Sequence, residues 1–335
     1  MHSMISKKLS QFPSSSINRQ VTILAASISI LFVLFQSWSL FSQHPVYSKP
    51  LSPLDSPVTV RVGDEIPRKI WYKFGARGLS HDAIAWTGSC IEKNPGYAVE
   101  FLTDETADAW VQKRFAHRPD IVEVYLALQI PIIKADWLRY LLLYAEGGVW
   151  SDLDVSCNSP IETWIPPQYK DEASIVVGWE FDTTWPGAAP KHELATWTVL
   201  AKPGSPHMWT AVEGVLQGLH DVARENGVDV AGITATPPMM GDIVTFCGPR
   251  RMTRSIFDSL QRMLNMTDSE FQEVESSTWF NLEPKLVGDV LILPGYSFAL
   301  SMGFYDEAVS GAIGPPLVEH HYAGSWKNDK GGEFL

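Results

Sequence analysis

Two aspartates, Asp152 and Asp154, stand one residue apart at the end of the apolar segment 147–155, GGVWSDLDV. Residues i and i+2 of an extended segment point to the same side, so we expect both carboxylates to converge. Like charges held this close repel each other unless a cation lies between them. Oxygen ligands suit Mg²⁺ and Mn²⁺, which often complete their coordination with substrate phosphates. The spacing therefore predicts a divalent-metal site, although a solvated pair on a loop has the same pattern.

A second polar pair, Asp136 and Arg139, lies three residues apart in the segment IIKADWLRYLLLYAEGG (132–148). This segment is expected to be a helix that ends at its glycines, which places the two side chains on one face. An ordinary surface ion pair, worth under about 1 kcal/mol, is the alternative. The apolar neighbours favour a face turned toward a polar cavity. The short link through the glycines then lets both pairs line one pocket.

The elements that must position these residues alternate between strands and helices. Further strands are expected at 66–74, 97–104, 149–155, 173–182 and 290–298, and a helix at 105–115. This alternation predicts an α/β sheet, in which ligands gather at the carboxyl ends of the strands. No linker interrupts the chain after Ile66, so we expect one domain from there onward.

The amino-terminal region has the pattern of a membrane anchor. Residues 21–41 carry no charge, and Lys7, Lys8 and Arg19 precede them. About twenty mostly apolar residues suffice to cross a bilayer, and the positive-inside rule keeps the short amino terminus in the cytosol. A cleavable signal peptide is the alternative. The expected organisation is a cytosolic tail (1–20), a transmembrane anchor (21–41), a Pro/Ser-rich stem (42–65), a catalytic domain (66–328) and a carboxyl-terminal tail (329–335).

The overall charge narrows the range of partners. The 335 residues carry a net charge of −12, which argues against nucleic acid as a ligand.

The three cysteines, Cys90, Cys157 and Cys247, include no CxxC pair. They allow at most one intramolecular disulfide, whose pairing the sequence does not determine. Asn265 begins an Asn-Met-Thr acceptor for N-glycosylation, provided that it faces a lumen.

The segment KADWLRYLLLYAEGGVWSDLDV (134–155) resembles the D-x-x-R…G-G-x-Y-x-D-x-D core of glycosyltransferase family 32 and its fungal initiation-specific α-1,6-mannosyltransferases. Four more segments resemble family motifs in the same order: IPRKIWYKF, SIVVGWEFD, ATWTVLAKPGSPHM and the closing HHYAGSW (320–326). The likeness spans about residues 66–327. Trp150 departs from the pattern, since tyrosine is commoner at this position.

The resemblance implies a GT-A fold, a nucleotide-sugar donor, Mn²⁺ (or Mg²⁺) and a single-pass Golgi anchor with a luminal catalytic domain. By that resemblance Asp136 and Arg139 hold the donor sugar and ribose. Asp152 contacts the donor and assists the metal through water, and Asp154 ligates the metal directly. The closing motif supplies further candidates for the metal and diphosphate: His320, His321, Ser325 and Trp326. A structural role is the alternative for the histidines, and Trp71 either stacks on the nucleotide base or belongs to the core.

The predicted activity is a metal-dependent retaining α-1,6-mannosyltransferase that moves mannose from GDP-mannose to a protein-linked N-glycan. One alternative keeps the fold but uses a UDP-sugar donor or a glycolipid acceptor. Another is an inactive, membrane-tethered glycan-binding protein or a subunit of a glycosyltransferase complex. The intact aspartates and Arg139 favour an enzyme, and donor hydrolysis distinguishes it from a binding protein.

Overall fold

The computed structural model describes residues 62–183, 191–230, 243–300 and 313–323. The chain divides into two units, Met1–Pro53 and Leu54–Leu335, and all described residues belong to the second. The predicted anchor and nearly all of the predicted stem therefore lie outside the described residues. Within the described ranges, no helix is both long and apolar enough to span a bilayer.

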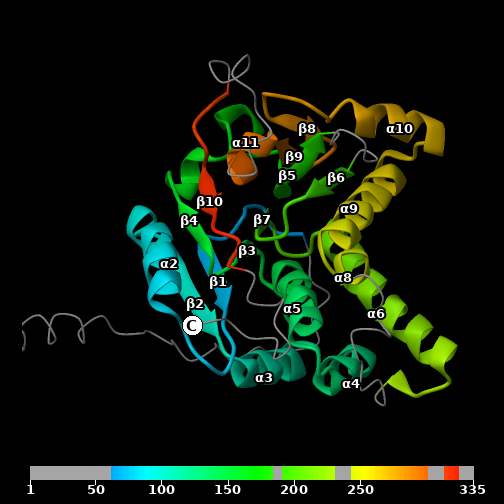
Figure 1. Cartoon of the computed structure of the whole chain (residues 1–335). Coiled ribbons are helices and arrows are strands. Elements are labelled where there is room, and N and C mark those ends of the chain that lie inside the picture. Colours follow the sequence, from blue (N-terminus) through cyan, green and yellow to red (C-terminus); the bar gives the residue numbers. More distant parts are fainter. Residues whose placement is uncertain (1–61, 184–190, 231–242, 301–312, 324–335) are drawn as a thin grey trace, which may run out of the picture. The chain divides into compact units, whose positions relative to one another are not determined.

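An eight-stranded mixed sheet forms the centre of the domain (Figure 1). Its main path has the order β2-β1-β3-β7-β5-β9-β8, and β6 pairs with β5. The strands are β1 (Lys69–Lys73), β2 (Ala98–Leu102), β3 (Gly148–Ser151), β5 (Ile175–Thr183), β6 (Lys191–Leu194), β7 (Thr198–Ala201), β8 (Lys285–Val287) and β9 (Val290–Leu293). Strands β1, β2, β3, β5 and β9 share one direction, whereas β6, β7 and β8 run against their neighbours.

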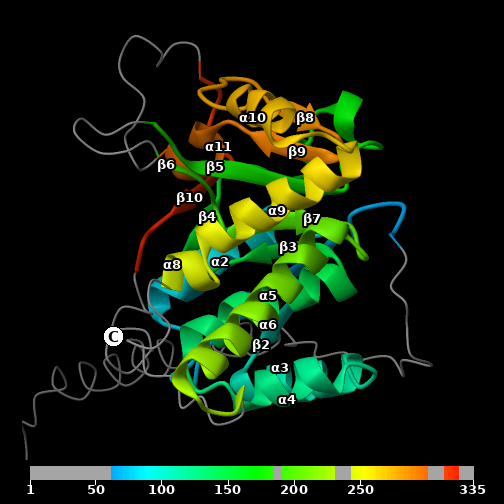
Figure 2. The same ribbon diagram turned by 90° about the vertical axis from the view of Figure 1, so that its right-hand side faces the viewer.

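Helices cover one face of this sheet. They are α3 (Asp104–Arg114), α4 (Pro119–Ala127), α5 (Pro131–Ala145), α6 (Pro206–Asn226) and α9 (Pro249–Leu264). Their buried side chains form one hydrophobic core with alternate residues of the strands, such as Trp71 of β1 and Trp150 of β3. Helices α5, α6 and α9 lie along this face (Figure 2). The core therefore fixes α5, which carries Asp136 and Arg139, against β3.

The other face of the sheet has a different cover. It consists of α2 (His81–Lys93), α11 (Gly295–Ala299) and a small antiparallel sheet of β4 (Val155–Cys157) and β10 (Val318–His320). Ile70 and Tyr72 alternate with Trp71 along β1 and point into this second core, as the two-residue period of a strand requires. The remaining described helices are α8 (Ile243–Phe246), α10 (Asp268–Ser276) and two short 3-10 helices, η1 (Ile161–Thr163) and η2 (Pro167–Tyr169).

The predicted α/β domain, a mixed sheet flanked by helices, is confirmed. The strand expected at 290–298 is too long, because β9 ends at Leu293 and Pro294 then precedes α11. The helix expected over 132–148 ends at Ala145, and Gly147 follows its C-cap with a φ of 64°. This left-handed conformation is the usual C-terminal signal that glycine provides.

A disulfide joins Cys90 of α2 to Cys157 of β4, which settles the pairing that the sequence left open. The two cysteines are 67 residues apart in the chain. Cys247 remains a free, buried thiol. The bond ties α2 to the small sheet that follows the Asp152–Asp154 segment directly, so it holds one border of the predicted site.

We expect replacement of both Cys90 and Cys157 by serine to lower the free energy of unfolding by about 2–4 kcal/mol, since a cross-link over a loop of this length restricts the unfolded chain. Chemical denaturation measures the change. Dithiothreitol should destabilise the wild-type protein but leave the double variant unaffected. Equal unfolding midpoints for both proteins would contradict the structural role of the disulfide.

Candidate active site

The predicted site residues gather at the carboxyl ends of the parallel strands. Asp152 directly follows β3, and its backbone N–H donates to the carbonyl of Trp197 just before β7, at 2.8 Å. Because β1, β3 and β5 run in the same direction, this edge is where an α/β sheet presents ligand-binding groups. The structure therefore places Asp152 at the edge of the sheet where the sequence analysis expected ligands to gather.

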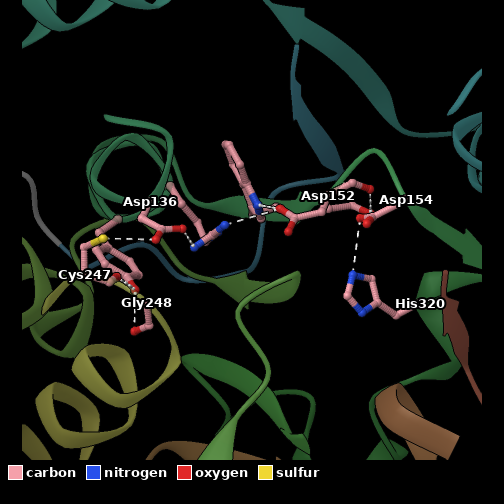
Figure 3. A network of polar contacts seen from close by, with 10 residues as sticks. Asp136, Asp152, Asp154, Cys247, Gly248 and His320 are labelled. Atoms are coloured by element: carbon pink, nitrogen blue, oxygen red, sulfur yellow. Dashed lines mark hydrogen bonds and ion pairs between the residues drawn. The ribbon is translucent and has the colours of Figure 1, made fainter. Parts of the chain in front are cut away.

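The segment Asp152–Asp154 is a tight turn and not an extended strand end. Strand β3 stops at Ser151, and the N–H of Val155 closes the turn on the carbonyl of Asp152 at 3.2 Å. The two carboxylates consequently have different partners (Figure 3). Asp152 contacts Arg139 and Trp150, whereas Asp154 contacts His320. The expectation of an extended backbone at Asp152–Asp154 is therefore wrong, and each carboxylate has its own partners.

Asp136 and Arg139 form a buried ion pair. The Arg139 Nη1 donates to Asp136 Oδ1 at 2.7 Å, and the two side chains are only 4% and 7% exposed. The other terminal nitrogen, Nη2, lies 3.3 Å from Asp152 Oδ1. The alternative of a surface ion pair is therefore wrong, because Arg139 bridges a helical carboxylate and the first aspartate of the D-x-D segment inside the protein.

Trp150 adds a second restraint on Asp152. Its indole N–H donates to Asp152 Oδ1 at 2.6 Å, and its ring lies 5.1 Å from the Arg139 guanidinium carbon. A guanidinium over an indole ring is a favourable cation–π contact. Trp150, which departs from the family pattern, thus contacts both Asp152 and Arg139.

Burial and neighbouring charges act in opposite directions on the helical pair. Burial raises the pKa of Asp136 above its usual range, with the positive charge of Arg139 opposing it. For Arg139, burial alone lowers the pKa, but the carboxylates of Asp136 and Asp152 outweigh burial and raise it. Arg139 therefore stays charged, and its positive charge is fixed beside Asp152.

Asp154 has its own partners on the strand that returns beside it. His320 Nε2 lies 3.3 Å from Asp154 Oδ1, and the backbone N–H of Ala323 donates to Asp154 Oδ2 at 3.0 Å. Burial alone raises the pKa of Asp154, but the hydrogen bonds and charge of these neighbours outweigh it and lower the pKa. The pairing of β10 with β4 brings His320 to this position from 166 residues further along the chain.

His321 does not join Asp154 through its side chain. Its Nε2 lies 2.9 Å from Ser156 Oγ, and its ring stacks on Trp86 at 4.4 Å. Only the backbone N–H of His321 reaches Asp154, donating to its carbonyl at 2.8 Å. The side chain of His321 therefore contacts Ser156 and Trp86 and not Asp154 in this structure.

Trp71 is completely buried, and its indole N–H donates to the carbonyl of Gly147 at 2.8 Å. Lys69 Nζ lies 3.5 Å from the ring centroid. A nucleotide base finds no accessible ring face here, so the core alternative holds in this structure. The predicted contacts of Ser325 and Trp326 lie outside the described residues.

The candidate metal ligands of the site provide only part of the coordination that a divalent cation needs. Asp154 supplies oxygens and His320 a ring nitrogen within 3.3 Å of each other, and both atom types ligate Mn²⁺. Among the described residues, no group of three or more acidic, histidine or cysteine side chains is close enough to enclose a metal. Mg²⁺ and similar ions often keep several waters and substrate phosphates as ligands, so the two residues fit an open metal site.

Two residues of this network were not predicted from the sequence. Cys247 lies with its sulfur 3.1 Å from Asp136 Oδ2, and Trp197 stacks on His320 at 4.1 Å with an interplanar angle of 15°. Neither lies near its partner in the chain. Trp197 belongs to the family-like segment ATWTVLAKPGSPHM, but nothing in that segment indicates a contact with His320, and Cys247 belongs to no such segment. Only the fold brings them to the site.

Comparison with known proteins agrees with the motifs. Residues 80–171 match the family "Glycosyltransferase sugar-binding region containing DXD motif". The initiation-specific alpha-1,6-mannosyltransferase of Schizosaccharomyces pombe is 32% identical over 280 residues, which cover 79% of this chain and 65% of that protein. The chain thus spans slightly less than two thirds of this relative's length. The Candida albicans protein of the same name is 26% identical, with 78% of this chain and 72% of that protein covered.

Among solved structures, the PaToxG glycosyltransferase shares 15% identity at a TM-score of 0.42, over 64% of this chain and 76% of that chain. The segment that matches the family includes Asp136, Arg139 and both aspartates of the D-x-D turn. The resemblance predicted from the sequence is therefore confirmed: the chain contains the DXD-containing sugar-binding region of the glycosyltransferases.

Proposed function

We propose that this protein is a metal-dependent, retaining glycosyltransferase that transfers mannose from GDP-mannose to a protein-linked glycan. The observation that carries the proposal is the buried Arg139, which joins Asp136 to Asp152 at the carboxyl edge of the sheet. Its Nε is buried and has no hydrogen-bond partner among the described residues. A buried donor without a partner is costly, and an oxygen of the donor sugar or ribose would satisfy it.

Different residues of the site bind different parts of the nucleotide-sugar donor in this proposal. Asp136 and Arg139 orient the sugar and ribose, and Asp152, held by Arg139 and Trp150, contributes a further contact to the donor. Asp154 and His320 would hold Mn²⁺ or Mg²⁺. A bound divalent ion stabilises the charge that develops on a leaving diphosphate, an effect worth several kcal/mol. Arg139 adds a fixed positive charge to the same wall of the site.

The choice of mannose and GDP has support from the relatives alone. The similar proteins of Schizosaccharomyces pombe and Candida albicans are named alpha-1,6-mannosyltransferases. A UDP-sugar donor and a glycolipid acceptor are the competing assignments within the same fold. Two relatives matched over short segments are named as enzymes of inositol phosphoceramide mannosylation, which keeps the lipid acceptor as the second candidate.

We place the catalytic domain in the Golgi lumen, behind a single anchor at residues 21–41. The uncharged segment and the basic residues before it support this arrangement. The Cys90–Cys157 disulfide also supports it, since such bonds persist in oxidising compartments. We also propose that the protein associates with other glycosyltransferases of the same membrane.

The donor assignment predicts that GDP binds in the presence of Mn²⁺ and loses at least tenfold in affinity when EDTA removes the metal. The chain has a net charge of −12, so its average field repels a nucleoside diphosphate, and local cations must supply the attraction. Calorimetry with GDP and UDP, each with and without Mn²⁺, measures both effects. Metal-independent binding would contradict the electrostatic argument, and a preference for UDP would contradict mannose transfer while leaving glycosyl transfer intact.

Replacing Asp154 by asparagine should reduce turnover about 100-fold or more, because it removes the charge that holds the metal. The amide oxygen still accepts from Ala323, so the melting temperature should change little. Glu172→Ala, an exposed acidic position just before β5 at the opposite edge of the sheet, is the matched control and should keep full activity. Wild-type turnover by a folded Asp154→Asn protein would refute the metal assignment.

The luminal orientation predicts a glycan on Asn265. This residue is exposed at the C-cap of α9, and Thr267 completes the acceptor pattern. When the full chain is expressed in a fungal cell, an endoglycosidase should increase its mobility on a gel. Asn265→Gln should abolish the shift, and Thr267→Ser, which keeps the acceptor pattern, should preserve it. A folded, membrane-bound protein that shows no shift would count against a luminal domain.

A further inference from the structure

Cys247 lies in the short connection between α8 and α9 and is completely inaccessible to solvent. Its backbone carbonyl accepts a hydrogen bond from the Tyr140 hydroxyl at 2.7 Å. Tyr140 directly follows Arg139 on α5. This contact fastens the connection to the helix that carries the charged pair, although the two segments are 107 residues apart in the chain.

The side chain of Cys247 points at the carboxylate of Asp136 (Figure 3). Its sulfur lies 3.1 Å from Oδ2, while Oδ1 accepts from Arg139 Nη1 at 2.7 Å. The two oxygens of Asp136 thus have separate donors on either side. The backbone carbonyl of Ile243, 3.7 Å from the sulfur, is the more distant acceptor for the same thiol.

The protonation state of the thiol agrees with a donor role. Burial, together with the negative charge of Asp136, raises the pKa of Cys247 well above its usual range. A neutral thiol has a hydrogen to donate, whereas a thiolate at this distance would repel the carboxylate. Complete burial also withholds the sulfur from oxidants and thiol reagents.

We propose that Cys247 is a positioning residue for sugar transfer: its S–H group fixes the rotation of the Asp136 carboxylate and, through it, the place of the Arg139 guanidinium at the donor site. This inference rests on the proposed function. Asp136 is held at two points only if the thiol is present. Without it, Oδ2 becomes a buried acceptor with no donor, and the carboxylate turns to find one. Arg139 Nη1 then loses its fixed acceptor, Asp136 Oδ1, and the contact of Nη2 with Asp152 changes as well.

A purely structural role for Cys247 predicts a different result. In that case the volume of the side chain matters, and serine and alanine both lack the bulk of the sulfur. Only serine keeps a hydrogen-bond donor, so the pair Cys247→Ser and Cys247→Ala isolates the hydrogen bond from the packing. The positioning role therefore predicts that the two variants differ in activity, whereas a packing role predicts that they behave alike.

The test measures GDP affinity with Mn²⁺ by calorimetry, and sugar transfer kinetics, on the full chain. We expect Cys247→Ser to retain kcat/KM within about threefold of the wild type. Cys247→Ala should lose at least tenfold, and the two variants should melt at similar temperatures. Equal activity of the serine and alanine variants, whether both high or both low, would overturn the inference.

A double-mutant comparison keeps the test decisive where either variant is unstable. If Cys247 acts through Asp136, then Cys247→Ala should weaken GDP binding in the wild-type background but have little further effect in the Asp136→Asn background. Additive losses in both backgrounds would overturn the inference. A wild-type protein that neither binds a nucleoside diphosphate nor transfers sugar overturns the proposed function, and this inference with it. An active wild type with additive losses overturns the role of Cys247 alone.

Discussion

The need to keep a buried guanidinium in contact with carboxylates constrains the whole site. Arg139 is 4% exposed, and a charge removed from water is tolerated only with well-placed opposite charges. Asp136 comes from the same helix and Asp152 from the end of β3, so the two elements must keep a fixed distance and orientation. The ring of Trp150 closes a further side of the guanidinium. Helix, strand and turn are thereby held together around one positive charge.

Two glycines allow the helix and the strand to come this close. Gly147 and Gly148 have φ angles of 64° and 95°, in the region that residues with a side chain rarely adopt. A Cβ on Gly147 would lie 2.7 Å from the carbonyl oxygen of Ala201, and one on Gly148 would lie 2.7 Å from that of Lys69. The chain can therefore pass from α5 into β3 between two neighbouring strands. A larger residue at either position would push α5, and with it Arg139, away from Asp152.

Local patterns predicted much of this arrangement and failed where distant segments decide the geometry. The segment 132–148 with its closing glycines was sufficient to predict α5, although the helix ends at Ala145, before both glycines. Residues 149–155 were expected to form one strand, with Asp152 and Asp154 on one side of it. Strand β3 instead stops at Ser151, and β4 begins at Val155, where it pairs with the distant β10. The contact of Cys247 with Asp136 spans 111 residues. No periodicity within a segment could indicate it.

The different partners of Asp152 and Asp154 have an electrostatic consequence. Asp152 shares Arg139 and the indole N–H of Trp150, so much of its negative charge is already compensated. Asp154 faces the His320 imidazole and the backbone N–H of Ala323 instead. A metal held symmetrically by both would have to compete with Arg139 for Asp152. The turn instead gives the two aspartates separate surroundings: Asp152 is held by Arg139 and Trp150, whereas Asp154 is held by His320 and the backbone N–H of Ala323.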